Sequence, residues 1–148
     1  MFKKTENSRS IISHQSKIVG DIELHEELEL NGFLHGNIIS SAAIRLNTDA
    51  NIIGNVMAAS LNVNSGKIEG DILCHTHFKS EVLTEIKGNI KAESAIISGT
   101  IYGNVSIQKL LTLDSSAKVF GTIEANEIKV LNGALFNGEV NIRGNLLD

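Results

Sequence analysis

The sequence lacks several residue types on which most globular cores rely. Among its 148 residues there is no proline or tryptophan and only one tyrosine, and aromatic residues make up 4% of the chain. A core without aromatics must obtain its buried area from aliphatic side chains, which favours many thin, equivalent layers. The single cysteine, Cys74, excludes an intramolecular disulfide scaffold and is typical of a reducing compartment.

Long hydrophobic runs and a strong charge of either sign are also missing. No apolar run approaches the roughly 18 residues of a spanning helix and no signal-peptide pattern opens the chain, so we expect a soluble, cytoplasmic protein. The formal net charge is -4. Residues 1–17 hold four basic residues and one acidic residue, which gives +3 there and -7 in the remainder. An acidic body argues against nucleic-acid binding, which requires clustered lysine and arginine.

What the sequence does contain is an internal repeat marked by glycine. A glycine, a polar residue and then isoleucine or valine recur eight times, at intervals of 16, 18, 16, 18, 15, 18 and 17 residues. The repeated glycines are Gly20, Gly36, Gly54, Gly70, Gly88, Gly103, Gly121 and Gly138. An apolar residue lies two positions before and two positions after each glycine, an alternation typical of a strand with one buried face. We therefore expect two or three short strands in each repeat, with corners between them.

A repeat of about 17 residues is too short to bury its own apolar face. Stacking resolves this, because each coil then pairs with the coils above and below it and the inward side chains form one continuous column. The spacing predicts an all-β, single-domain β-solenoid of about eight coils of 15–18 residues over residues 13–146. Corners that need positive φ or close backbone approach explain the glycines.

Four further glycines follow a second regularity. They recur at a nearly constant spacing of two coils and occur only in the shorter coils. These glycines are Gly32, Gly66, Gly99 and Gly133. The longer coils have an extended polar segment at the same point, at residues 47–51, 81–85 and 114–118. Either the structural unit is a pair of coils or the repeat has drifted, and the sequence leaves both alternatives open.

The repeated Gly-Asp/Asn-Ile/Val coils, the short head that begins Met1-Phe2-Lys3-Lys4 and the small acidic body together resemble the bactofilins, polymer-forming bacterial cytoskeletal proteins. The resemblance covers residues 13 to about 146 as the repeat domain and residues 1–12 as a head, with residues 147–148 as a short tail. It implies a right-handed parallel β-helix of triangular cross-section that assembles end to end into filaments without nucleotide. It also implies attachment to the inner face of the cytoplasmic membrane and scaffolding of cell-wall or morphogenetic factors.

The terminal coils of the predicted solenoid have no capping helix, because the repeat continues close to the C-terminus and no amphipathic helical segment flanks it. An uncovered coil exposes apolar side chains and backbone groups, so we expect copies of this chain to bind one another through two polymerisation faces. The N-terminal face is predicted to consist of Ile18, Ile22, Leu24, Leu28 and Leu30. The C-terminal face is predicted to consist of Phe136, Val140, Ile142, Leu146 and Leu147.

The head, residues 1–12, is interpreted as a disordered segment that targets the membrane. Met1 and Phe2 suit the lipid interface, and Lys3 and Lys4 suit anionic headgroups. One head would bind weakly, whereas many heads along a filament would bind through avidity. The alternative is a solvated terminus without a binding role.

No catalytic or cofactor motif is apparent in the sequence. Cys74, His75 and His77 are the only cluster of ligand-type residues, and strand alternation would point Cys74 inward and place both histidines outward, about 7 Å apart. We interpret them as surface histidines and expect no enzyme activity, cofactor or metal. The asparagines beside the corner glycines are interpreted as turn residues or a stacked ladder. They are Asn37, Asn55, Asn89 and Asn104.

Two other classes of protein have similar short repeats. Left-handed β-helix enzymes, either acyltransferases or carbonic-anhydrase-like proteins, form trimers and have a strict six-residue period, whereas the coils of this chain vary in length. A solenoid adhesin or phage spike would be expected to be larger or to carry a signal sequence. The filament-forming alternative is therefore preferred.

Overall fold

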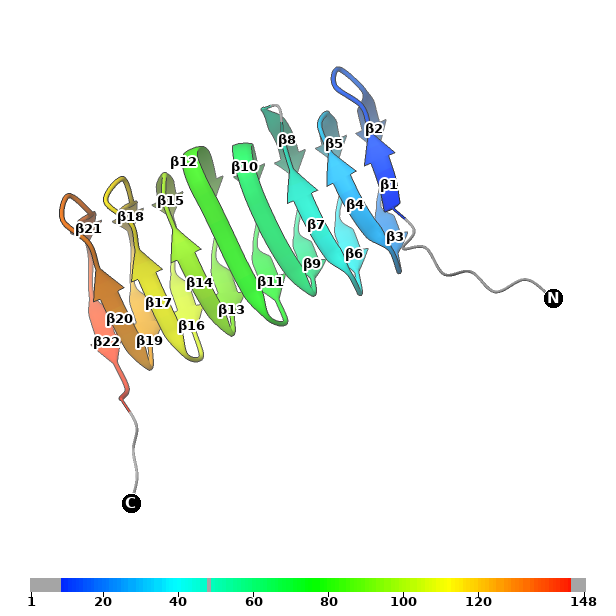
Figure 1. The fold of residues 1–148 in the computed structure, drawn as a ribbon. Coiled ribbons are helices and arrows are strands. Elements are labelled where there is room, and N and C mark those ends of the chain that lie inside the picture. Colours follow the sequence, from blue (N-terminus) through cyan, green and yellow to red (C-terminus); the bar gives the residue numbers. More distant parts are fainter. Residues whose placement is uncertain (1–8, 48, 145–148) are drawn as a thin grey trace.

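Short parallel strands stack into eight coils in a computed structural model that describes residues 9–47 and 49–144 (Figure 1). Each coil turns through three faces, and every strand pairing between neighbouring coils is parallel. The described residues contain no helix. The predicted all-β, single-domain β-solenoid is therefore confirmed.

The three faces each receive one strand segment from every coil. The first face holds β1 (Arg9–Ile12), β4 (Glu27–Leu30), β7 (Ala43–Leu46), the start of β10 (Ser60–Glu69), the start of β12 (His77–Lys87), β14 (Ser94–Ile97), β17 (Leu110–Leu113) and β20 (Glu127–Val130). The second face holds β2 (Lys17–Val19), β5 (Phe33–His35), β8 (Ala50–Ile53), the ends of β10 and β12, β15 (Thr100–Tyr102), β18 (Lys118–Phe120) and β21 (Leu135–Asn137). The third face holds β3 (Ile22–Leu24), β6 (Ile38–Ser40), β9 (Val56–Ala58), β11 (Ile72–Cys74), β13 (Ile90–Ala92), β16 (Val105–Ile107), β19 (Ile123–Ala125) and β22 (Val140–Ile142).

The first two faces form one 14-stranded sheet, because β10 and β12 continue around the corner between them. The third face is a separate eight-stranded sheet. Its strands are only three residues long, so each has two inward side chains and one outward side chain.

The core is a column of aliphatic side chains stacked in register between coils. On the third face, Ile38 pairs with Val56 and Val56 pairs with Ile72, and all three are buried. Period-two alternation turns these residues inward, and each neighbouring coil places an equivalent residue directly over them. The scarcity of aromatics follows from this geometry, because thin equivalent layers are filled by aliphatic side chains of similar size.

The glycine that recurs eight times in the sequence lies at the corner between the second and third faces, and the geometry of this corner explains why glycine is needed. Gly54 has φ +150°, and a Cβ built there would lie 2.0 Å from the carbonyl oxygen of Gly36 in the preceding coil. No side chain fits so close to a backbone oxygen, and L-residues rarely adopt this φ. Glycine is therefore required for the close stacking of successive coils at this corner.

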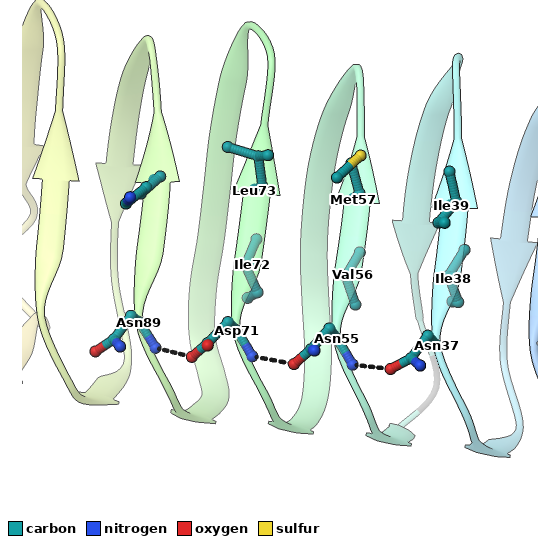
Figure 2. Close-up of a pocket in the computed structure, with 11 residues that line it drawn as sticks. Asn37, Ile38, Ile39, Asn55, Val56, Met57, Asp71, Ile72, Leu73 and Asn89 are labelled. Carbon is teal, nitrogen blue, oxygen red and sulfur yellow. Dashed lines mark hydrogen bonds between the residues drawn. The ribbon is translucent and has the colours of Figure 1, made fainter.

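The residues that follow the first seven corner glycines form a ladder of hydrogen bonds, part of which is drawn in Figure 2. The main-chain N–H of Asn55 donates to Oδ1 of Asn37 at 2.8 Å, and the N–H of Asp71 donates to Oδ1 of Asn55 at 2.9 Å. The same contact recurs from Asp21 in the first coil to Thr122 in the seventh. The ladder prediction for these asparagines is confirmed.

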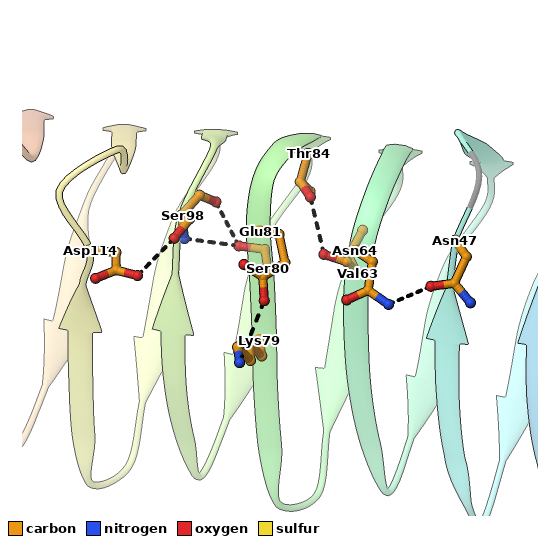
Figure 3. Close-up of polar contacts among 9 residues, drawn as sticks. All are labelled: Asn47, Val63, Asn64, Lys79, Ser80, Glu81, Thr84, Ser98 and Asp114. Carbon is orange, nitrogen blue, oxygen red and sulfur yellow. Dashed lines mark hydrogen bonds and ion pairs between the residues drawn. The ribbon is translucent and has the colours of Figure 1, made fainter.

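The corner between the first and second faces alternates between long and short forms through the first seven coils, whereas the corner of the eighth coil is as long as that of the seventh. Gly99 belongs to a short corner, and a Cβ there would lie 2.6 Å from the carbonyl oxygen of Thr84 and 2.7 Å from that of Glu81 in the long corner of the preceding coil. Polar contacts link these corners: Ser80 Oγ donates to the Ser98 carbonyl at 2.8 Å (Figure 3). The short corner thus packs closely onto the long one, which supports the two-coil unit.

Candidate functional site

The C-terminal end of the solenoid is an open apolar layer. The inward residues of the last coil include Val140, which is 40% exposed, and Ile142, which is 61% exposed. Their counterparts one coil earlier, Ile123 and Ala125, are both 0% exposed. Phe136 also belongs to this end and is partly buried, whereas its counterpart Val119 is fully buried. The difference arises because no further coil covers the last one among the described residues.

The N-terminal end is an apolar layer of the same kind. Ile18, Ile22 and Leu24 belong to the first coil, where they are partly buried against the core. The prediction placed Leu28 and Leu30 beside them, and here it was wrong. Both residues belong to β4 of the second coil and are 2% and 0% exposed.

The residues that cover Leu28 and Leu30 lie in a segment assigned to the head. Strand β1 (Arg9–Ile12) pairs with β4, so that Ser10 lies over Leu28 and Ile12 lies over Leu30. The solenoid therefore includes residues 9–12, and the boundary predicted at residue 13 was four residues too late. No glycine of the repeat precedes β1, which is why its membership was missed. Its alternation, with Ser10 and Ile12 inward, was the available signal.

At both ends of the described solenoid, backbone groups also lack the neighbouring coil with which their counterparts in other coils form hydrogen bonds. In each of the seven preceding coils the corner glycine donates its N–H to the next coil, as from Gly121 to the Asn137 carbonyl at 3.1 Å. The equivalent N–H of Gly138 points to where a further coil would lie beyond the described residues. At the other end, Gly20 donates to the His35 carbonyl, and the equivalent carbonyl of Val19 has no earlier coil beside it among the described residues. A neighbouring solenoid end would satisfy such groups by strand pairing.

Several predicted residues lie outside the part of the chain that the structure describes. The C-terminal face was predicted to include Leu146 and Leu147, and both lie beyond residue 144. The predicted membrane-binding residues Met1, Phe2, Lys3 and Lys4 precede residue 9.

The cysteine and histidine cluster does not form the predicted arrangement. Strand β11 ends at Cys74 and β12 begins at His77, so a corner separates them and His75 lies in that corner rather than on a common strand face. Cys74 is buried as predicted, and burial raises the pKa of its thiol to about 12. His77 Nδ1 lies 2.9 Å from Ser94 Oγ, and burial together with the charge of Lys79 lowers the pKa of His77.

Two further features were searched for in the described residues. Across residues 9–47 and 49–144, no three histidine, cysteine, aspartate or glutamate side chains gather closely enough to hold a metal ion. None of the segments that the structure describes is a helix long and apolar enough to cross a membrane.

A parallel β-solenoid whose described residues end in an open apolar layer on each side defines the class of uncapped β-solenoid proteins. A family model described as "Bactofilin: Polymer-forming cytoskeletal" matches residues 10–81 and 65–141. The matches span most of the chain, which belongs to the bactofilin family. The family is a structural, polymer-forming one, which favours the filament alternative over the left-handed β-helix enzymes.

One curated relative supports the same family. The chain is 27% identical over 77 residues to "Bactofilin BacP" of Myxococcus xanthus (strain DK1622). The alignment covers 52% of this chain and 32% of that relative, so the chain spans about a third of the relative's length. No solved structure matches significantly.

Proposed function

We propose that this chain polymerises end to end, without nucleotide, by stacking the open end of one solenoid on that of another. The observation that carries this proposal is the exposure of inward apolar residues in the last coil, at positions that are fully buried one coil earlier. The N-terminal layer contributes Ile18, Ile22 and Leu24, together with Ile12 of β1. The C-terminal layer contributes Phe136, Val140 and Ile142.

The size of the end layers suits reversible assembly. A junction that buries on the order of 400 Å² of apolar surface would contribute ~10 kcal/mol. Association itself costs about 4 to 15 kcal/mol in lost freedom of motion. Filament formation should therefore depend on protein concentration and on a good match of backbone groups across the junction.

The experiment that tests this proposal compares two substitutions in strand β21. Phe136 faces the core and Leu135 faces outward on the same strand, so Phe136→Arg places a charge in the junction whereas Leu135→Arg does not. We expect negative-stain electron microscopy in nucleotide-free buffer to show filaments for the native chain and for Leu135→Arg, and none for Phe136→Arg. Filaments of normal length from Phe136→Arg would contradict the proposal.

We further propose that the filament lies at the inner face of the cytoplasmic membrane, where it scaffolds cell-wall or morphogenetic factors. The support is the pattern Met1-Phe2-Lys3-Lys4, which joins two apolar residues to two cations. Each cation near an anionic surface contributes about 1 kcal/mol, and a filament multiplies the number of heads. Removal of residues 2–4 should abolish co-sedimentation with anionic vesicles, and unchanged co-sedimentation would contradict the membrane proposal.

A further inference from the structure

A row of outward side chains runs along the third face, with one member from each three-residue strand. The register of the strands places the members in successive coils. The first five are Glu23, Ile39, Met57, Leu73 and Lys91. Three consecutive members are apolar, and an acidic residue and a basic residue bound them. We call these five residues the third-face row.

The apolar centre of the third-face row is accessible. Ile39 is 50% exposed, and Ile39, Met57 and Leu73 line a shallow groove of about 480 Å³ beside the ladder residues (Figure 2). Outward positions on a solvated sheet face are normally polar. On the first face, the strands of the same three coils place polar residues outward in register, namely Glu29, Arg45 and Asn62. An apolar stripe bounded by opposite charges indicates a surface that is buried when another protein surface binds to it.

We propose that the third face binds the third face of a second copy of this chain, with the two solenoid axes antiparallel. A two-fold axis along the strand direction through Met57 generates this arrangement. It places Glu23 opposite the partner's Lys91 and Ile39 opposite the partner's Leu73. The third-face row is thus complementary to itself in both charge and apolarity.

Charge decides between the two possible orientations. A parallel arrangement of the axes would place Glu23 opposite the partner's Glu23 and Lys91 opposite the partner's Lys91, which is repulsive at both ends. In the part of the chain that the structure describes, neither Glu23 nor Lys91 forms an ion pair. Exposed ion pairs contribute little affinity but select among orientations. The two charges therefore specify the antiparallel arrangement, and the apolar centre supplies the contact.

The contact area indicates when the pairing matters. Strands of three residues are about 10 Å long and five coils span about 24 Å, so one copy contributes roughly 240 Å², against the ~800 Å² per partner of a stable interface. An isolated pair is therefore short-lived. Two filaments would repeat the contact along their length and hold together by avidity. The strength of the pairing thus rests on the proposed end-to-end assembly, whereas its geometry does not.

Cross-linking of the full chain tests the geometry. Ile39→Cys and Leu73→Cys chains are treated, separately and mixed, with a bismaleimide whose spacer matches the ~10 Å between sheets packed face to face. The thiol of Cys74 is buried and its pKa is about 12, so only the introduced cysteines react. We expect several-fold more cross-linked dimer in the mixture than in either variant alone. Glu23→Lys on both chains should lower that yield, and addition of Lys91→Glu should restore it.

Electron microscopy of the same samples separates the two proposals. Equal yields in the mixture and in the single variants would overturn the antiparallel pairing, whether or not filaments are present. A higher yield with Ile39→Cys alone would show the parallel arrangement and overturn it as well. Preferential cross-linking in a sample without filaments would support the pairing of third faces and contradict the end-to-end assembly.

Discussion

Substitution of two corner glycines separates the cost of backbone conformation from the cost of coil stacking. Gly20 and Gly54 occupy the same corner, with φ +134° and +150°. A Cβ at Gly54 would lie 2.0 Å from the Gly36 carbonyl oxygen, whereas a Cβ at Gly20 would meet no atom within 4 Å. Alanine at either site requires an unfavourable φ, which costs about 1–3 kcal/mol. Only at Gly54 must the neighbouring coil also move to relieve the contact.

The additional cost at Gly54 is that of overpacking, about 1–3 kcal/mol or more. We therefore expect Gly54→Ala to lower the free energy of unfolding by ~2 kcal/mol more than Gly20→Ala. For a chain of this size the difference corresponds to a melting temperature lower by about 4–8 °C. Thermal unfolding followed by circular dichroism measures it, in a Phe136→Arg background shown to be monomeric by light scattering. Equal destabilisation by the two substitutions would refute the stacking explanation.

Substitutions at three further positions test other features of the fold. Asn104→Ala removes the acceptor for the Thr122 N–H at 3.0 Å and should cost ~1 kcal/mol in chemical denaturation, whereas Asn104→Asp keeps the acceptor and should cost less. The unfolded Cys74 thiol loses its proton near pH 9 and the folded one near pH 12, so stability should fall between these values by up to ~1.4 kcal/mol per pH unit. Cys74→Ala should be tolerated, because Cys74 pairs with the buried Ala58, and it should remove that part of the pH dependence. Leu28→Arg should unfold the first coils in circular dichroism, and an intact fold would contradict the assignment of β1.

The repeat predicted the strands well, because the alternation of apolar and polar residues within one coil shows which side chains point toward the core. Ile52, Gly54 and Val56 illustrate this: two inward residues flank a corner that only glycine can occupy. The same pattern identified the C-terminal layer around Phe136 and Val140. Such signals are carried by residues close together in the chain and therefore need no knowledge of what lies above or below.

Contacts between coils were less predictable. No repeat glycine precedes strand β1, and the strand belongs to the solenoid because it pairs with β4 of the next coil. The same contact buries Leu28 and Leu30, which sequence alone had placed at the open end. His75 was placed on a strand face for a related reason, since the alternation does not reveal where a corner interrupts a strand.

The sequence by itself thus determined the number of coils, the inward residues and the glycine corners, because each depends on strand alternation or on the spacing of the corner glycines. Only the tertiary structure decided which coil is terminal and which outward side chains become neighbours. The exposure of an inward side chain near an end depends on whether another coil covers its own coil, as the contrast between Leu28 and Ile142 shows. The third-face row likewise exists only because strand register brings Ile39, Met57 and Leu73 into line.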